Sequence, residues 1–418
     1  MILIILFLGL ILRLILASHG TYWGDMNSWI GWSNRLLDVG FKDFYLTWCD
    51  YLPGYLYILW FLGNLKNVFL SLKINIPNEV FYKMPSILAD LGISYLIFKI
   101  VKEFKNKKTA LISSAIYLFN PAIWVNSSLW GQADGFLAFF LFLAFYLFAK
   151  KNIFVSAIFF GLSCIIKPLS FFVLPFISFY LLIKKKIKTF FTFLLTSLMI
   201  IILSFIPFSE GNYFNFVFDR FKIVFEQYPY TSLNAFNFWG VLSLLWEADN
   251  LKFLQLSYQN WGMIIFALFY LLISIIMIKN LVSKKLTRKK ETYFLFAFAG
   301  LILFNTYLFS TRMHERHLLP AFSFLNLAAV FNPFIWITYF IASLIYILNL
   351  RYAFVWLTYD FKLIFSPLVV QLFSLLQLII FIFLFFVLEK RPPLFKNKPT
   401  LKSIRSRLLK NRFLKKKR

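Results

Sequence analysis

The sequence predicts an all-α polytopic membrane protein. Of its 418 residues, 61% are hydrophobic and only 15% are charged, whereas soluble globular domains contain roughly 45–50% and 25%. A water-soluble fold of this composition would lack the polar side chains that it needs to cover its surface. Apolar runs recur from Met1 to Val387, and the longer ones reach the roughly 20 residues that a membrane-spanning helix requires.

Net charge and cysteine content exclude other classes of protein. The formal net charge is +27, which in a soluble protein would indicate nucleic-acid binding. Beside membrane spans, an excess of lysine and arginine marks the cytoplasmic face, so we expect no nucleic-acid partner. The two cysteines, Cys49 and Cys164, are too few for a disulfide scaffold or a cysteine-rich metal site.

Twelve apolar segments are predicted to span the membrane as helices. Arg13 interrupts the first, and no basic residue precedes it, which favours a retained span over a cleaved signal peptide. The predicted spans are Ile2–Ala17, Phe81–Val101, Thr109–Val125, Gly135–Ala149, Ile153–Ile166, Leu169–Ile183, Thr189–Phe208, Trp261–Ile278, Thr292–Phe309, Leu318–Phe331, Phe334–Leu350 and Leu363–Leu388.

Clusters of lysine and arginine predict the orientation of these spans. With Lys99, five clusters hold 30 of the 44 basic residues, and the positive-inside rule assigns them to the cytoplasm. With twelve spans and both termini in the cytoplasm, all five clusters lie on the cytoplasmic face of the membrane. Of the 17 acidic residues, 13 then lie on the outer side, so an enzyme that needs carboxylates would work there. The clusters are Lys102–Lys108, Lys150–Lys151, Lys184–Lys188, Lys279–Lys290 and Lys390–Arg418.

A further apolar stretch, Leu52–Leu72, is predicted to lie in the outer interface or to be re-entrant. It is interrupted by polar residues, and a crossing here would move Lys102–Lys108 to the outer side. We therefore expect a catalytic membrane module over 1–208 with interfacial helices in an outer loop at 18–80, a variable membrane module over 209–388 with outer loops 209–260 and 310–317, and a basic cytoplasmic tail over 389–418.

Four polar constellations interrupt the apolar pattern on the predicted outer side. The first, Tyr22–Asn27, follows the first span and contains Asp25. An acid at the membrane interface is partly desolvated, which raises its basicity and suits a general base that takes a proton from a sugar hydroxyl. The alternative is a solvated loop acid that caps a helix starting near Ser28.

The second and third constellations, at 48–57 and 120–135, combine aromatic with polar side chains. Aromatic residues around an acid and a proline are typical of membrane anchors, and they also form the walls of sugar sites. A dense polar connection between two spans is either a plain loop or a group of side chains that stack on and hydrogen-bond a sugar. On the sugar-site interpretation, the acceptor or sugar ligands are Asp50, Tyr51, Trp130, Gln132 and Asp134.

The fourth constellation, Thr311–His317, places two arginines, two histidines and one acid between two spans. Guanidinium groups bind phosphate bidentately, and imidazoles add hydrogen-bond donors. The histidines flank Glu315 in the manner of a metal site, but no third strong ligand is near in sequence, so we expect no metal cofactor. With the lysine before Pro168, the predicted phosphate ligands are Lys167, Arg312, His314 and Arg316.

Taken in order, these constellations resemble the GT-C glycosyltransferases that use polyprenyl-phosphate-linked sugars. The bacterial and archaeal mannosyltransferases related to the second GPI mannosyltransferase are similar, as are the eukaryotic dolichyl-phosphate-glucose glucosyltransferases. The resemblance runs from about Trp23 to Pro320. Its most specific segments are Asn120–Asp134, Lys167–Pro168 and Arg312–Pro320, and Lys83–Asp90 also fits.

The resemblance implies a GT-C fold whose first outer loop carries interfacial helices and a catalytic acid. Asp25 matches that acid by position. Asp50 matches the acid of an Asp-Tyr-Pro-Pro element, in which Leu52 replaces the first proline here. His317 stands where many relatives have tyrosine.

The sequence therefore predicts an inverting glycosyltransferase that moves a hexose, with mannose the first candidate, from a polyprenyl-phosphate sugar to an acceptor hydroxyl on the outer face. Asp25 is the expected base, and the cations stabilise the departing phosphate. The expected partners are this donor, a glycan, glycolipid or protein acceptor, and membrane lipids. The alternative is a lipid-linked-sugar flippase or another transporter, but transport paths usually place ionisable residues near the midplane, and only Arg13 and Asp90 fit that description.

Overall fold

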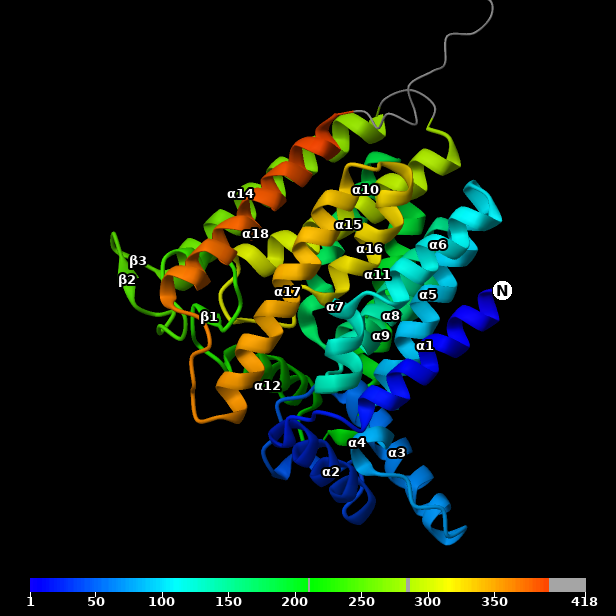
Figure 1. Cartoon of the computed structure of the whole chain (residues 1–418), viewed down its shortest axis with the longest axis vertical. Helices are drawn as coiled ribbons and strands as arrows, with labels where there is room; N and C mark the ends of the chain where they lie inside the picture. Colours follow the sequence, from blue (N-terminus) through cyan, green and yellow to red (C-terminus); the bar gives the residue numbers. More distant parts are fainter. Residues whose placement is uncertain (210, 283–285, 391–418) are drawn as a thin grey trace, which may run out of the picture.

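Helices make up nearly all regular structure in the described part of the chain, residues 1–209, 211–282 and 286–390 of a computed structural model (Figure 1). This confirms the predicted all-α class. From 391 onward the predicted basic tail lies outside the described residues. The helices that match the predicted spans are α1 (Ile2–Ala17), α5 (Met84–Phe104), α6 (Lys107–Leu118), α8 (Asp134–Ala149), α9 (Ile153–Ile166), α10 (Leu174–Ile183), α11 (Ile187–Leu203), α14 (Tyr258–Val282), α15 (Arg288–Phe309), α16 (Leu319–Phe331), α17 (Ile335–Thr358) and α18 (Pro367–Glu389).

The membrane helices differ in length. Within the described residues, six helical segments are long and apolar enough to cross a bilayer, and others, such as α1 and α8, are shorter. The span predicted over Thr109–Val125 is broken, because α6 ends at Leu118 and Asn120 caps a separate turn, α7 (Pro121–Trp124). The residue before a proline disfavours the helical conformation, and Asn120 is accordingly extended.

Helix α15 forms the centre of the bundle. Every residue from Thr292 to Phe309 is buried, and the helix packs against α14, α16 and α18. Helices α11 and α14 lie at the periphery, where large apolar side chains such as Leu195 and Leu271 are more than half exposed. Exposed apolar side chains on peripheral helices are stable in lipid but costly in water.

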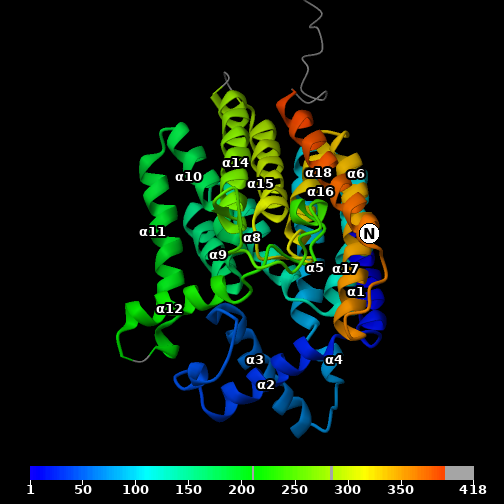
Figure 2. The same cartoon turned by 90° about the vertical axis from the view of Figure 1, so that its left-hand side faces the viewer.

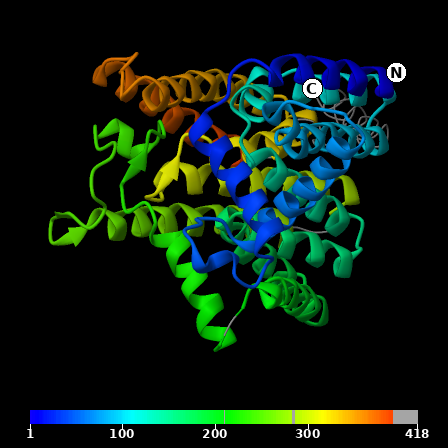
Figure 3. The same cartoon turned by 90° about the horizontal axis from the view of Figure 1, so that it is seen from below.

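The segment predicted to be the first outer loop folds into α2 (Trp23–Asp38), α3 (Pro53–Ser71) and α4 (Asn78–Phe81). Helices α2 and α3 lie beyond one end of the bundle (Figures 1 and 2), and α2 crosses in front of the helix ends when seen from below (Figure 3). Thus α3 lies outside the group of spanning helices, as the charge pattern predicts.

The segment predicted to be the second outer loop contains the amphipathic helix α12 (Tyr213–Glu226), the short α13 (Phe238–Val241) and three short strands, β1 (Ser232–Leu233), β2 (Lys252–Phe253) and β3 (Leu256–Ser257). Strand β2 pairs antiparallel with β3. Strand β1 pairs in parallel with β4 (Met313–His314), with Ser232 opposite Met313. This pairing anchors the loop between α15 and α16 to the segment between α12 and α13.

The basic turns lie together at the end of the bundle opposite α2 and α3 (Figure 2). Glu103, at the end of α5, forms ion pairs with Lys150 (2.5 Å) and Arg288 (2.9 Å). Lys184 donates to the carbonyl of Leu281 (3.2 Å). Four of the predicted cytoplasmic clusters therefore share one end of the bundle, which is the arrangement that the alternation of spans requires.

One ion pair is fully buried inside the bundle. Arg13 Nε of α1 lies 2.9 Å from Asp90 Oδ2 of α5, and both side chains have no exposed surface. Arg13 also donates to the carbonyls of Gly9 and Leu118, and Ser127 donates to Asp90 Oδ2 (2.6 Å). A buried charge is tolerated when it is paired and hydrogen-bonded, so this network holds α1, α5 and the segment after α7 together.

We expect Asp90→Asn to lower the stability of the purified protein by about 3–5 kcal/mol, because Arg13 would remain buried without a counter-charge. The measurement is thermal unfolding in detergent. Glu103→Gln, which breaks exposed ion pairs, is the control and should cost less than about 1 kcal/mol. Equal losses in the two variants would contradict a structural role for the buried pair.

Candidate active site

Asp25 lies in the first turn of α2 and receives two hydrogen bonds from a distant part of the chain. Trp130 Nε1 donates to Asp25 Oδ2 over 3.3 Å, and Gln132 Nε2 donates to the same oxygen over 2.5 Å. Within the described residues, no hydrogen bond to Asp25 Oδ1 is formed. One oxygen therefore fixes the carboxylate, and the other retains its lone pairs.

The segment that donates to Asp25, residues 125–132, has an unusual backbone. A π-helical turn, Val125–Trp130, ends at Gly131, whose φ of 89° lies in the left-handed region that glycine adopts readily. The backbone N–H groups of Gly131 and Gln132 both donate to the carbonyl of Asn126. Trp130 and Gln132 are buried, and the Trp130 ring packs edge-on against Phe354. Two predicted sugar ligands are thus directed at Asp25.

Asp50 and Tyr51 lie between a single 3-10 turn, Phe44–Leu46, and the start of α3. Trp29 Nε1 of α2 donates to the Tyr51 hydroxyl (3.3 Å), and the Tyr45 hydroxyl donates to the Tyr51 carbonyl (2.8 Å). Asp50 Oδ1 is buried without a hydrogen-bond partner in the described residues. Burial raises the pKa of Asp50, although a hydrogen bond with Gln227 opposes the shift.

Lys167 and Arg316 converge on Asp134 at the start of α8. The proline that follows Lys167 favours an extended conformation there, which ends α9 (φ −148°, ψ 141°). Lys167 Nζ lies 3.0 Å from Asp134 Oδ1. Arg316 Nε lies 3.7 Å from Asp134 Oδ2, too far for a hydrogen bond. Asp134, expected to bind sugar, is fully buried and is therefore a partner of the two cations.

Arg316 retains an unused donor. Its Nη1 bonds Glu315 Oε1 (2.9 Å), but its Nε is buried without a hydrogen-bond partner in the described residues. Burial disfavours the charge of Arg316, yet the carboxylates of Glu315, Asp134 and Asp25 together raise its pKa. The guanidinium is therefore charged, close enough to Asp25 to feel its field, and able to bind a further anion.

Arg312 is occupied. Its Nε and Nη2 contact both oxygens of Asp249 (2.7 and 3.4 Å), and its Nη1 donates to the carbonyl of Phe225 (2.6 Å). Arg312 also has a φ of 65°, an uncommon conformation for a residue with a side chain. Of the two arginines predicted to bind phosphate, Arg316 has a donor to spare, and Arg312 fastens the loop to Asp249.

The two histidines of this loop present one donor each. Arg316 Nη1 lies 3.2 Å from His314 Nδ1, and the backbone N–H of His314 donates to His317 Nδ1 (3.2 Å). A guanidinium only donates, so both Nδ1 atoms accept, and each neutral ring carries its proton on Nε2. Burial lowers the pKa of His317 to about 3, and burial followed by the charge of Arg316 lowers the pKa of His314 well below its usual value.

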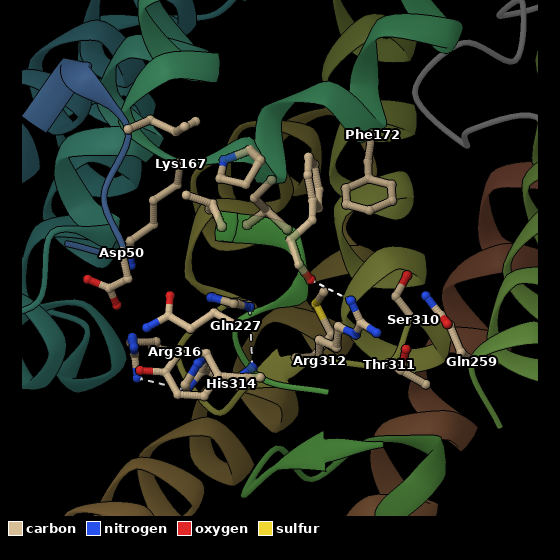
Figure 4. Close-up of a pocket in the computed structure, with 18 of the residues that line it drawn as sticks. Asp50, Lys167, Phe172, Gln227, Gln259, Ser310, Thr311, Arg312, His314 and Arg316 are labelled. Atoms are coloured by element: carbon tan, nitrogen blue, oxygen red, sulfur yellow. Dashed lines mark hydrogen bonds between the residues drawn. The ribbon is translucent and has the colours of Figure 1, made fainter. Parts of the chain in front are cut away.

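A cavity of about 570 Å³ is lined by Asp50, Lys167, Arg316 and both histidines, whereas Asp25, Trp130, Gln132 and Asp134 are not among its lining residues. At one side, Asp50, Lys167 and Arg316 lie close together (Figure 4). The wall formed by the turn before α10 and by α14 is apolar and includes Phe172 and Phe266. The cavity therefore combines a polar, cationic end with an apolar wall. Its other lining residues are Tyr51, Leu52, Ile166, Pro168, Leu169, Val224, Phe225, Gln227, Tyr228, Gln259, Met263, Ala267, Ser310, Thr311, Arg312, Met313, His314 and His317.

Several cavity residues were not predicted. Gln227 and Tyr228 follow α12, and Gln259 begins α14. The amphipathic pattern of α12, with Phe214 and Phe218 exposed on one face, is the one sequence signal that marks this region. Among the described residues, no three histidine, cysteine, aspartate or glutamate side chains are arranged to hold a metal ion.

The lowered histidine pKa values predict a pH effect on stability. Between pH 3 and about 6.5, an unfolded histidine binds a proton that folded His317 does not. Stability therefore rises with pH across this window and is lost as the pH falls. We expect the loss of thermal stability between pH 7.5 and pH 5 to be smaller in His317→Gln, by about 2 kcal/mol. The exposed His19→Gln is the control, and identical pH dependence in all three proteins would refute the neutral assignment.

The chain was compared with known proteins. A search of curated proteins gives no match. Residues 77–311, more than half of the chain, match glycosyltransferase family 87. The matched region contains Trp130 and Gln132, which donate to Asp25, and also Asp134 and Lys167. Asp25 itself precedes the matched region, which ends one residue before Arg312. The chain therefore belongs to glycosyltransferase family 87 and is a membrane glycosyltransferase.

Proposed function

We propose that this glycosyltransferase moves a hexose from a polyprenyl-phosphate-linked sugar to an acceptor hydroxyl, with inversion at the anomeric carbon. The observation that carries the proposal is the two-sided character of the cavity. Asp50, Lys167 and Arg316 line its polar end, and Phe172 and Phe266 line an apolar wall. A donor that joins a charged phosphate sugar to a lipid chain needs both environments in one site.

The proposed reaction is a single displacement. The acceptor oxygen forms a bond to the anomeric carbon while the bond from that carbon to the phosphate oxygen breaks. The acceptor proton passes to the carboxylate of Asp25, and the electron pair of the broken bond leaves with the polyprenyl phosphate. Attack from the face opposite the leaving group inverts the anomeric configuration. The unpaired Oδ1 of Asp25 supports its assignment as the base.

Arg316 and Lys167 are the proposed phosphate ligands. Arg316 Nε is a buried donor without a hydrogen-bond partner among the described residues, and its contact with Asp134 is long. A phosphate oxygen placed there would gain a charge-assisted hydrogen bond without breaking a good one. His314 and His317 would add neutral N–H donors, and Arg312 would contribute charge at the cavity wall. Donors fixed before the reaction stabilise the charge that develops on the leaving phosphate.

The sugar, the acceptor and the membrane face follow from the sequence. Mannose is proposed on the resemblance to mannosyltransferases alone. The acceptor is a glycan, glycolipid or protein with an accessible hydroxyl. The outer face is proposed because the site lies at the end of the bundle away from the basic turns, where Glu103 pairs with Lys150 and Arg288. The proposed domains remain the catalytic module over 1–208, the variable module over 209–388 and the tail.

Asp25→Asn should lower the turnover number by about 10²–10⁴-fold, because the amide cannot take a proton. Its affinity for the donor should change little, since the carboxylate acts on the acceptor. The measurement is sugar transfer by the detergent-purified variant, with donor binding determined on the same sample. Transfer at the wild-type rate would remove Asp25 from the mechanism and leave Asp50 as the next acid to test.

Arg316→Ala should weaken donor binding by about 1.5–3 kcal/mol, roughly 10- to 100-fold, because a charge-assisted hydrogen bond is lost. Arg316→Lys should recover only part of this loss. Arg312→Ala is the matched control, since its guanidinium is held by Asp249 and Phe225, and it should affect thermal stability more than donor affinity. The reverse result, with Arg312 deciding the affinity, would assign the phosphate to the other arginine.

A further inference from the structure

Lys83, directly before α5, is a buried cation that the proposed mechanism does not use. Its side chain has no exposed surface, and it does not line the cavity. Its ammonium group lies 2.9 Å from the carbonyl of Ala17, 2.7 Å from that of Gly20 and 3.0 Å from the hydroxyl of Thr21. It also lies 3.0 Å from the carbonyl of Leu129.

These four contacts join two separate segments. Ala17, Gly20 and Thr21 form the connection from α1 to α2, which leads to Asp25. Leu129 immediately precedes Trp130, one of the two donors to Asp25. An ammonium group has three protons, and a buried one is costly unless acceptors surround it. Lys83 therefore holds the backbone before the acid against the backbone that carries its donors.

The first turn of α5 adds a second contact to the same segment. Ser86 Oγ donates to the carbonyl of Gln132 (2.7 Å), and Gln132 is the other donor to Asp25. The stem of Lys83 also packs against Gly131, where an added Cβ would lie 2.7 Å from Lys83 Cε. Lys83 thus binds the backbone of Leu129, the residue before Trp130, and Ser86 binds the backbone of Gln132 itself. Both donors to Asp25 are held in place in this way.

We propose that Lys83, supported by Ser86, is a positioning residue for the transfer reaction. Its contacts hold the carboxylate of Asp25 in place against Trp130 and Gln132. This inference rests on the proposed role of Asp25 as the base. Lys83 touches neither the cavity nor the reacting atoms, so it acts on turnover and not on donor affinity. A shift of the acid by about 1 Å is enough to cost roughly 10²-fold in rate.

The test is a double-mutant cycle with Lys83→Met and Asp25→Asn. Methionine keeps the unbranched stem that packs on Gly131 and removes the ammonium. We expect Lys83→Met to lower the turnover number by at least about 10-fold, with the KM for the polyprenyl-phosphate sugar within about 2-fold of wild type. In the Asp25→Asn background the same substitution should cause little further loss, because residues that act as a unit are non-additive.

Ser94→Ala is the matched control. It removes a buried hydroxyl two turns further along α5, where Ser94 bonds Ser114 of α6, and its turnover should stay near wild type. If Lys83→Met does not fold, Ser86→Ala replaces it, since it removes one hydrogen bond and should lower turnover by about 2- to 10-fold.

Three results would overturn the inference. The first is wild-type turnover in folded Lys83→Met, and the second is a raised donor KM with unchanged turnover. The third is a double variant whose loss of turnover equals the product of the losses in Lys83→Met and Asp25→Asn. A different result, wild-type transfer by Asp25→Asn itself, would refute the proposed base. The failure of the inference is thereby separated from the failure of the proposed function.

Discussion

Two hydrogen bonds to a single oxygen of Asp25 connect helix α2 to the membrane helices, and the rest of the site is arranged around this connection. The donors, Trp130 and Gln132, belong to a π-helical turn and its left-handed glycine cap. Because Trp29 of the same helix α2 also bonds Tyr51, fixing α2 fixes the segment that carries Asp50. The proposed base and the cavity-lining residues Asp50 and Tyr51 are therefore held in a fixed position relative to one another.

The low dielectric of the membrane explains why the charges occur in groups. A charged side chain among apolar helices must be paired and hydrogen-bonded. Arg13 and Asp90 form a buried ion pair away from the cavity, although Asp90 Oδ1 has no hydrogen-bond partner in the described chain, and we assign this pair a structural role. Lys167, Arg316, Asp134 and Glu315 satisfy one another only in part, since Arg316 Nε and Asp134 Oδ2 lack hydrogen-bond partners in the described chain. Lys167 and Arg316 of this network line the cavity, where a substrate can supply the missing partner.

Much of the fold was predictable from sequence because the bilayer imposes simple rules. Span length and the placement of Lys102–Lys108 were enough to predict that the helix now seen as α3 lies outside the bundle. Helix α12 was missed, because Asp219, Arg220 and Lys222 interrupt its apolar residues and leave an amphipathic pattern without a spanning run.

The pairing of side chains was less predictable, because it depends on residues far apart in sequence. Nothing within Thr311–His317 distinguishes Arg312 from Arg316. The difference arises from Asp249, which comes 63 residues before Arg312 and occupies its guanidinium. In the same way, Gln132 was predicted as a sugar ligand, and no pattern in the sequence indicated that its amide donates to Asp25, 107 residues away. Motifs in a single sequence indicated the participants and not their partners.

The most direct test is a structure of the protein in a lipid nanodisc with an unreactive polyprenyl-phosphate-sugar analogue bound. The phosphate should lie within hydrogen-bond distance, about 3 Å, of Arg316 Nε and Lys167 Nζ, with the lipid chain along Phe172 and Phe266. The open face of the anomeric carbon should point toward Asp25. A phosphate bound outside this cavity would contradict the proposed site. So would a sugar placed so far from Asp25 that an acceptor hydroxyl could not contact both the carboxylate and the anomeric carbon.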